Sequence, residues 1–567
     1  MERPPIFQIG LPHLGTRRLV RAFEDAGYTT NHRRGGETAL DIAYHRRRGA
    51  RPLDLFEGTD LFTDLESADR PFRPPVLAYA DFAYLHEQFP AAYFLLVTGD
   101  RDRWVEARMT MREGRYRRAE AIALGVAEEA LPAVWRRRWD RHHARATAYF
   151  ADHDRFLLLD ARTDGAREIA RLVSDDYRLG THDDQPLVRR PRRAARTPQP
   201  KPRRTAAALV DEVVHHATRR TPGVPGGMSL LEASASYAQW DGGTTVRNRH
   251  GRPSHCAVDL AAPWPFLFDV ARNPRHARTE AVLNELWQLG ARRGAALDLQ
   301  DARRYGTTAT RAPDRPILTY VRQSGADNLV LWPLPGFHTP GTVDFPGPGP
   351  EDRLAYADKR DVVAWRGNLT GRAVPELGAA GVDAEHAQRL AERLGGPDHD
   401  AALAALRTVP RFRIVDRLHD HADFDIGLVP STALSELSRR PEVAKLVRPR
   451  VDYAELYRSR YLLSLSGNDG GSNLLKVLDS ASVVLKEEDP WELFYSSLFR
   501  PWKHYVPLAR GCDDLEERLD WARTHPRECQ DMSAAAREQV RLLVDPGHRR
   551  AYLGGILEVY EQRFTAG

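Results

Sequence analysis

The chain has 567 residues, of which 42% are hydrophobic and 28% charged, and its 83 basic residues exceed its 78 acidic residues by five. This composition excludes a wholly disordered chain, and so small a net charge gives no reason to expect nucleic acid as the main partner. The length predicts about three or four domains.

Cysteine content and hydropathy indicate the compartment. Three cysteines without CxxC spacing cannot build a disulfide framework, which is typical of a reducing compartment. No apolar run approaches the roughly 18–20 residues that span a bilayer, and the N-terminus does not follow the pattern of a secretory signal. We therefore expect a cytoplasmic protein without a transmembrane segment.

The first part of the chain alternates between predicted strands and helices. Apolar runs at 6–9, 92–97 and 156–159 predict strands, and 16–26 predicts a helix. This alternation is typical of an α/β domain with a mainly parallel sheet, which we place at 1–188.

A linker follows this domain. Residues 189–204 hold eight basic residues, four prolines and no acidic residue, so the segment cannot build a hydrophobic core. We interpret it as a semi-rigid spacer, whose charge would also suit a peripheral contact with an anionic surface such as a membrane.

Beyond the linker the alternation resumes and predicts two further α/β lobes, at 205–340 and 341–567. Apolar runs predict strands at 317–321, 329–331, 362–365, 412–415, 461–465, 483–485 and 505–507. Helices are expected at 278–294, 384–394, 399–407, 472–480, 513–524 and 532–543, with a closing helix at 548–563.

The loop at 10–16, GLPHLGT, follows a predicted strand and opens a predicted helix. In this setting backbone N–H groups and the helix N-terminus can face an anion. The loop is not a Walker A motif, because the lysine before the threonine is missing. A tight strand–helix turn without any ligand would give the same pattern.

Three segments of the first domain, 10–19, 87–108 and 138–160, resemble the sulfotransferases, whose donor is 3′-phosphoadenosine 5′-phosphosulfate. The resemblance covers about 6–185 and implies a P-loop-like fold with a phosphosulfate loop made of Gly10, His13, Gly15, Thr16 and Arg17. The loop lysine of that family falls on His13, and its 3′-phosphate arginine falls on Gly99. Because these cations are lost, we expect a degenerate lobe, with sulfo transfer and binding of another phosphorylated ligand as alternatives.

The densest group of polar residues lies at 461–507. A predicted strand ends in a glycine-rich turn with Asn468, Asp469 and Gly470, and Ser472 is expected to cap a helix. That helix carries two further predicted donor ligands, Asn473 and the rare lysine Lys476, one of only six in the chain. A close backbone approach, a helix N-terminus and a lysine together suit a diphosphate, whereas the turn alone would fit a plain strand–helix loop as well.

Two further features complete the predicted donor site. Glu492 follows the next predicted strand and is expected to accept hydrogen bonds from ribose hydroxyls. The segment with Arg366, Gly367, Asn368 and Arg372 follows another strand, and its arginines would clamp phosphate oxygens. Either arginine alone could also be an ordinary surface residue in this arginine-rich chain.

The segments DVVAWRGNLTGR and GNDGGSNLLKVLDSASVVLKEEDPWELFYSSLFRPWKHYVPL, with DNLVLWPLPGFHT, resemble glycosyltransferase family 90, the group of the cryptococcal capsule protein and the Notch protein O-glucosyltransferases. The resemblance covers about 225–565. It implies a GT-B fold of two Rossmann-like lobes, a UDP-sugar with xylose or glucose, inversion at the anomeric carbon and no essential metal. The arginine that animal members carry in this signature falls on Leu474, which leaves the sugar open.

An inverting transfer needs a carboxylate that takes the proton of the acceptor hydroxyl. The family places this base at a strand end in the N-terminal lobe, which corresponds to 296–306. Asp301 is our first choice and Asp298 the second. Either could instead be a turn or capping residue.

These features predict an inverting glycosyltransferase that moves a sugar to a hydroxyl of a glycan or a glycosylated metabolite. The expected partners are the nucleotide sugar and this acceptor, with no tightly bound cofactor and no metal. Three alternatives stay open: a bifunctional enzyme that also uses 3′-phosphoadenosine 5′-phosphosulfate, a non-catalytic nucleotide-binding scaffold, and a first lobe that only recruits the acceptor or a carrier protein.

Overall fold

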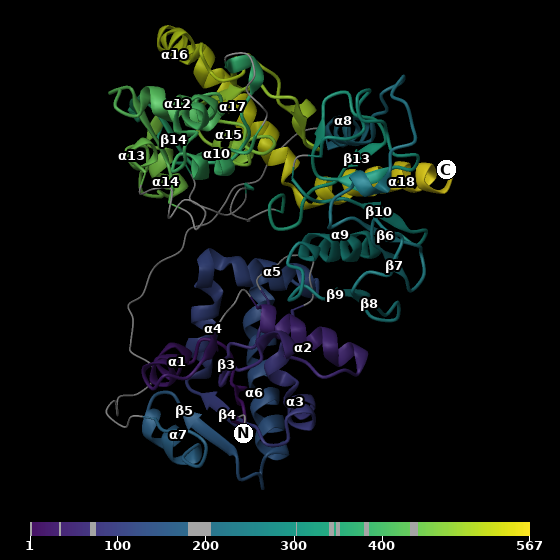
Figure 1. Cartoon of the computed structure of the whole chain (residues 1–567), viewed down its shortest axis with the longest axis vertical. Helices are drawn as coiled ribbons and strands as arrows, with labels where there is room; N and C mark the ends of the chain where they lie inside the picture. The colour runs from purple at the N-terminus through teal and green to yellow at the C-terminus, as the bar shows by residue number, and fades with distance from the viewer. Residues whose placement is uncertain are drawn as a thin grey trace. The chain divides into compact units, whose positions relative to one another are not determined.

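The computed structural model describes residues 3–32, 36–68, 75–179, 206–301, 303–339, 345–346, 352–378, 385–430 and 440–566. Its contacts divide the chain into two compact units (Figure 1). One comprises 1–200 and 240–292, and the other comprises 201–239 and 293–567. The predicted linker lies outside the described residues, and the separation of lobes at 205–340 and 341–567 stays a prediction.

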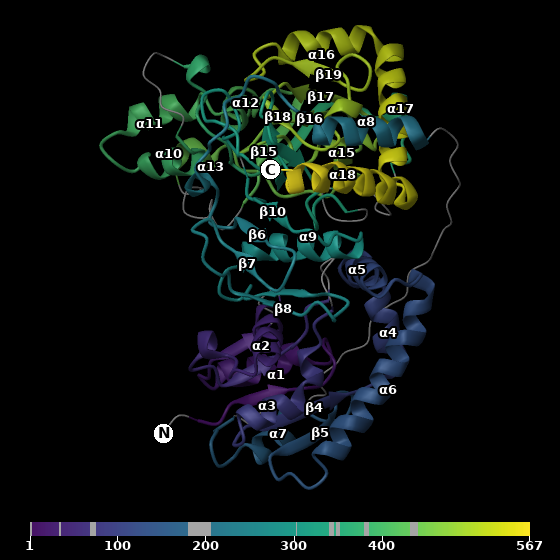
Figure 2. The same ribbon diagram turned by 90° about the vertical axis from the view of Figure 1, so that its right-hand side faces the viewer.

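The first unit contains a five-stranded parallel sheet in the order β2-β3-β1-β4-β5. Its strands are β1 (Ile6–Gln8), β2 (Thr30–His32), β3 (Leu61–Thr63), β4 (Tyr93–Thr98) and β5 (Phe156–Asp160). The helices are α1 (Thr16–Asp25), α2 (Glu37–Arg48), α3 (Phe82–Gln88), α4 (Arg101–Thr110), α5 (Arg115–Leu124), α6 (Leu131–Tyr149) and α7 (Ala166–Leu172). Helices α4 and α6 lie side by side (Figure 2). The central strands β1 and β4 are almost wholly buried, as expected of a parallel sheet, and confirm the predicted α/β class.

Residues 240–292 of the first unit add an antiparallel pair and a helix. Strands β8 (Cys256–Val258) and β9 (Phe266–Phe268) pair with each other, and α9 (His276–Gln288) packs against β9. The short strand β7 (Val246–Arg247) precedes them, and β6 (Ala238–Trp240) contains the point at which the two units divide.

The second unit is organised around a parallel sheet in the order β15-β14-β16-β17-β19. Its strands are β14 (Arg360–Gly367), β15 (Phe424–Leu428), β16 (Ser459–Ser464), β17 (Val483–Glu487) and β19 (Val506–Leu508). Strands β10 (Ala295–Leu297), β11 (Ile317–Thr319) and β13 (Leu329–Leu331) are parallel neighbours, and β12 (Arg322–Gln323) pairs with β18 (Trp491–Glu492).

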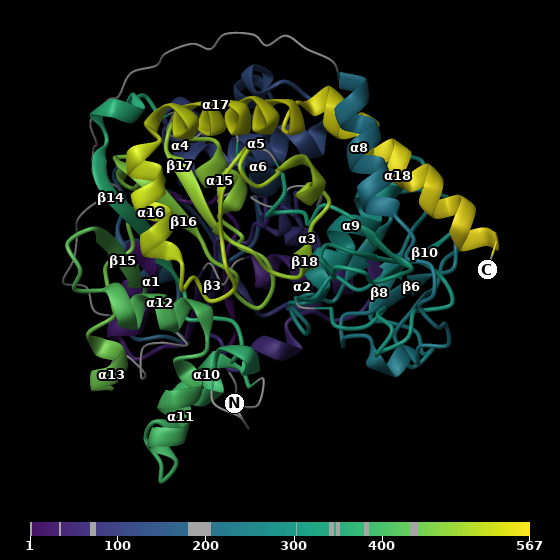
Figure 3. The same cartoon turned by 90° about the horizontal axis from the view of Figure 1, so that it is seen from above.

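The helices of this unit are α8 (Ala206–Thr218), α10 (Ala387–Arg393), α11 (His399–Leu406), α12 (Pro410–Leu418), α13 (Pro441–Ala444), α14 (Tyr453–Leu456), α15 (Leu474–Leu478), α16 (Leu515–Thr524), α17 (Pro526–Leu543) and α18 (Pro546–Ala566). Helix α17 packs on β17, and the closing helix α18 packs on α8 (Figure 3). Within the described ranges, no helix is long and apolar enough to cross a membrane.

Two of the sequence predictions are wrong. The run 412–415, predicted as a strand, lies inside α12, which Pro410 opens at a position where a helix needs no N–H donor. Its buried residues form the inner face of that helix, and the missed strand β15 follows at Phe424. Ser472 does not cap α15, since Asn473 holds that position. Every other predicted strand and helix overlaps an observed one.

Candidate functional site

Strand order places a candidate site in the second unit. The first strand of its five-stranded sheet along the chain, β14, lies between the second, β15, and the third, β16. The connections therefore leave β14 and β16 in opposite directions, and ligands of open parallel sheets bind beyond the carboxyl ends at such a point. The two loops that begin there are 368–372 and 465–473, the same two segments that the sequence singled out.

The two loops contact each other directly. The backbone N–H of Gly371 donates to Oδ1 of Asn468 over 3.1 Å. A Cβ atom at position 371 would lie 3.0 Å from the carbonyl oxygen of Gly467, and the φ of Gly371 is +109°, so the close approach requires glycine there.

Arg411 of α12 ties the loops together. Its guanidinium donates to oxygens of Asn368 (3.0 Å), Thr370 (2.7 Å), Leu465 (3.1 Å) and Ser466 (3.0 Å). Burial lowers the pKa of Arg411 to about 10, although nearby Asp469 and Glu487 act in the opposite direction. Sequence reasoning missed this residue because its helix was taken for a strand.

A group of cations gathers beside these loops. Burial lowers the pKa of Arg304, and the neighbouring charges of Arg372 and Arg510 lower it further. Arg372 contacts the ring of His386 over 2.6 Å, and burial, Arg372 and then other arginines lower the pKa of that histidine. We call Arg304, Arg372 and Arg510 the arginine group, because the charges of the last two act on the first. Like charges placed near one another create a positive potential.

Arg510 is held in place by a buried carboxylate. Glu487, at the end of β17, accepts hydrogen bonds from Arg510 Nη1 (2.9 Å), from Ser466 N and Oγ (2.9 and 2.6 Å) and from Gly511 N (3.1 Å). The side chain of Glu487 is fully buried. Since Ser466 belongs to the loop after β16, this network fixes Arg510 relative to the glycine-rich turn.

The first choice for the base lies at the same place. Oδ1 of Asp301 and Oδ2 of Asp469 both lie within hydrogen-bond distance of the Tyr320 hydroxyl, at 2.7 and 2.6 Å. Tyr320 directly follows β11, and Asp301 lies in the loop after β10. Contacts within the second unit therefore bring a predicted base and the predicted donor turn to one phenol oxygen.

Asp298 has a different environment. It directly follows β10, is fully buried and accepts hydrogen bonds from Ser234 N (2.9 Å), Ser234 Oγ (2.5 Å), Tyr305 Oη (2.8 Å) and Arg303 Nη1 (3.2 Å). These bonds occupy both carboxylate oxygens, whereas Asp301 is partly exposed. The geometry favours Asp301 over Asp298 as a group that an acceptor can reach.

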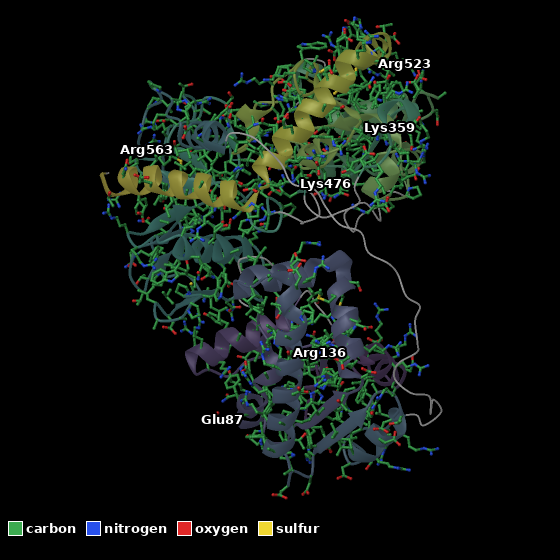
Figure 4. All side chains as sticks on the ribbon, turned by 180° about the vertical axis from the view of Figure 1, so that it is seen from behind. Glu87, Arg136, Lys359, Lys476, Arg523 and Arg563 are labelled. Atoms are coloured by element: carbon green, nitrogen blue, oxygen red, sulfur yellow. The ribbon has the colours of Figure 1, made fainter. Side chains whose placement is uncertain are left out.

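Several other predicted donor ligands have their polar groups engaged elsewhere. Arg366 donates to the carboxylate and the carbonyl of Asp425, and the Lys476 ammonium lies 5.8 Å from the centre of the Tyr453 ring (Figure 4 labels Lys476). The Asn473 amide bonds Ser464 and Leu463 of β16.

Glu492 is engaged as well. It accepts from Arg322 Nε over 2.9 Å and from Arg219 over 2.8 Å. Burial alone would raise the pKa of Glu492, and these arginines hold it below its usual value. Among the predicted donor ligands, Arg372 belongs to the arginine group, Asn468 bonds Gly371 beside it, and Asp469 shares the Tyr320 hydroxyl with Asp301.

The predicted phosphosulfate loop of the first unit joins β1 to α1. His13 and Gly15 both have a φ of 71°, Thr16 is buried and Arg17 is exposed. The backbone N–H of His13 donates to Oδ1 of Asp64 over 3.2 Å. A carboxylate of the chain thus lies against an amide that a bound anion would use.

The model of the family "Glycosyl transferase family 90" matches residues 431–566. Protein O-glucosyltransferase 3 of Rattus norvegicus is 29% identical over 140 residues, 24% of this chain and 27% of that protein. O-glucosyltransferase LpsA of Dichelobacter nodosus is 25% identical over 137 residues, 24% of this chain and 41% of that protein. Uncharacterized protein 027R of Frog virus 3 is 26% identical over 197 residues, 34% of this chain and 19% of that protein.

The chain therefore spans less than half the length of each of these relatives. A sucrose-phosphate synthase from Thermosynechococcus elongatus aligns over 38% of this chain and 47% of its own, with 12% identity and a TM-score of 0.23. The family match includes the glycine-rich turn and Arg510, while Asp301 and the loop after β14 precede it.

Proposed function

From the glycosyltransferase family 90 region at 431–566, we propose that the second unit transfers a sugar from a UDP-sugar, with inversion, to a hydroxyl of a glycan or a glycosylated metabolite. Xylose and glucose are the candidate sugars. Because several relatives are named O-glucosyltransferases, UDP-glucose is the first donor to test.

The arginine group is the observation that carries this proposal. Arg372 ends the loop after β14, Arg510 shares the buried Glu487 with Ser466 of the loop after β16, and Arg304 lies over the Trp491 ring. Burial and the charges of the other two lower the pKa of Arg304. Glu487 balances the charge of Arg510, and an anion bound beside Arg304 and Arg372 would lower the cost of bringing the remaining like charges together. A nucleoside diphosphate offers two phosphates at the sheet edge where nucleotides bind in such folds.

The proposed reaction follows from this arrangement. Asp301 takes the proton of the acceptor hydroxyl while that oxygen forms a bond to the anomeric carbon on the face opposite the leaving group. The bond between the anomeric carbon and the phosphate oxygen breaks, and UDP leaves with the electron pair. The arginine group stabilises the negative charge that develops on the leaving diphosphate.

Calorimetric titration with UDP tests the proposal. Arg372→Ala should weaken UDP binding about 10- to 100-fold, as expected for the loss of one charge-assisted contact. Arg458→Ala is a matched control, because Arg458 is exposed and pairs with Glu455 on the surface, and its UDP affinity should equal that of the wild type. Equal affinities of all three proteins would remove the arginine group from the donor site.

For the first unit we propose a degenerate sulfotransferase-like lobe. Asp64 lies against the His13 amide, so a phosphate at this loop would meet a carboxylate. The parallel sheet with a loop after its central strand is the observation that keeps a bifunctional enzyme as a second candidate. Stabilisation of the whole chain by 3′-phosphoadenosine 5′-phosphate in a thermal-shift measurement would support that second candidate, and no shift would support the degenerate lobe. A cytoplasmic location and a membrane contact through 189–204 are further proposals.

A further inference from the structure

The two short contacts of the Tyr320 hydroxyl require that either Asp301 or Asp469 is protonated. A phenol has one proton, so Tyr320 can donate to only one of the two carboxylate oxygens that lie 2.7 and 2.6 Å from it. The other short contact requires a proton on the carboxyl group itself, because a carboxylate only accepts hydrogen bonds. Asp301, Tyr320 and Asp469 therefore share two protons and one negative charge.

This shared charge can lie on either carboxyl group. In one arrangement Asp301 donates to Tyr320, Tyr320 donates to Asp469, and the charge lies on Asp469. In the other the direction is reversed, and the charge lies on Asp301. Only the second arrangement leaves Asp301 able to accept a proton from an acceptor.

We propose that Asp301, Tyr320 and Asp469 form a proton relay whose direction is set by the occupant of the glycine-rich turn, so that donor binding creates the ionised base. This inference rests on the proposed function. Tyr320 is a positioning residue in it, since it acts through the two carboxyl groups and not on the substrate.

The neighbouring charges determine which carboxyl group of the relay is ionised before and after a diphosphate binds. Before donor binding, the charge of Arg411, which bonds Leu465 and Ser466 shortly before Asp469, acts on the Asp469 carboxyl group and favours the negative charge there. A diphosphate in the turn adds negative charge beside Asp469 and makes its ionised form unfavourable. The proton of Asp301 then passes to the Tyr320 oxygen while the Tyr320 proton passes to Asp469, which conserves both protons and moves the charge to Asp301.

Two further described residues, Arg303 and His338, lie beside the relay. Arg303 donates to the backbone carbonyl of Asp301 and, over 3.2 Å, to the carboxylate of Asp298. The ring of His338 lies 6.3 Å from that of Tyr320, and its Nδ1 accepts the N–H of Leu334, so this nitrogen carries no proton.

Asparagine and alanine substitutions distinguish the two carboxyl groups. An amide at position 469 donates to Tyr320 as a protonated carboxyl does, whereas an amide at 301 cannot accept the acceptor's proton. We expect UDP release from UDP-glucose to be about ten-fold faster in Asp469→Asn than in Asp469→Ala. Asp301→Asn and Asp301→Ala should be equally slow, about 100-fold or more below the wild type.

Tyr320→Phe tests the link itself. It keeps the buried ring and removes the hydroxyl, so UDP release should fall about ten-fold or more while the UDP dissociation constant stays within about three-fold. Tyr457→Phe is the matched control, because it removes a buried hydroxyl that donates to a backbone carbonyl, that of Lys476. Its turnover should stay near that of the wild type, and circular dichroism should show each variant folded.

If the wild-type protein binds UDP, either of two results would overturn the relay alone. One is that Asp469→Asn releases UDP no faster than Asp469→Ala. The other is that Tyr320→Phe keeps full turnover. A folded wild-type protein that neither binds UDP nor releases it from UDP-glucose would instead refute the proposed function, and the relay with it.

Discussion

Replacing Arg411 by alanine should destabilise the second unit and weaken UDP binding, although Arg411 is not itself a proposed ligand. Its guanidinium makes four hydrogen bonds to the loops after β14 and β16. At roughly 1.5–3 kcal/mol for each bond from a charged donor, the bonds alone amount to about 6–12 kcal/mol. Burying the charge opposes this, as the lowered pKa of about 10 indicates. We expect a net loss of about 2–4 kcal/mol.

Arg413 provides the control on the same helix. It lies two residues further along α12 and pairs with the half-exposed carboxylate of Asp513, a contact worth about 0–1 kcal/mol. Urea unfolding of the full chain, followed by tryptophan fluorescence, gives the free energy of each variant, and calorimetry gives its UDP affinity. If Arg411→Ala and Arg413→Ala agree within about 0.5 kcal/mol, Arg411 does not hold the loops together.

Two further predictions concern buried titratable groups. Asp298→Ala should cost about 3–5 kcal/mol in urea unfolding, because it leaves the buried Tyr305 hydroxyl without its acceptor and removes the charge that faces the half-buried Arg303, whereas Asp301→Ala should cost less than about 1 kcal/mol. Burial lowers the pKa of His142 to about 4, so the unfolded chain binds more protons than the folded one between pH 6.5 and 4. Stability from this residue is therefore present above pH 6.5 and lost as the pH falls to 4, by about 3 kcal/mol at 1.36 kcal/mol per pKa unit. The slope of unfolding free energy against pH should be smaller in His142→Gln, and an unchanged slope would contradict the assignment.

The sequence was sufficient for the α/β class and for the two loops of the candidate site, because both loops follow strongly apolar strands. It could not reveal that the loops meet, since that depends on β15 lying outside β14 in the sheet. The strand β15 has a weak pattern, FDIGL, with an aspartate and a glycine inside it. The helix before it was misread because FRIV is a short apolar run, which fits either structure.

The residues of the proposed site that sequence reasoning missed gave no local signal. Tyr320 lies inside the predicted strand 317–321 and resembles an ordinary core aromatic, yet it is the first residue beyond β11. Arg304 and Arg510 are two of 77 arginines, so their type carried no information. The rare lysine Lys476 attracted attention for the opposite reason, and its ammonium lies over Tyr453. The scarcity of lysine reflects the composition of the chain and does not predict a ligand. Which basic side chains lie close together depends on tertiary contacts.

Substitution of Arg304 should affect UDP binding more than folding stability. Arg304 is repelled by Arg372 and Arg510, and it gains a cation–π contact with Trp491, whose ring centre lies 5.5 Å away. Both effects are on the order of 0.5–1 kcal/mol for a partly exposed group, so they nearly cancel. Arg304→Gln should therefore leave the unfolding free energy within about 0.5 kcal/mol of the wild type and still weaken UDP binding about ten-fold. The proposed function assigns this charge to the diphosphate, so a variant that loses more than about 1 kcal/mol of stability but binds UDP normally would show that Arg304 serves the fold instead.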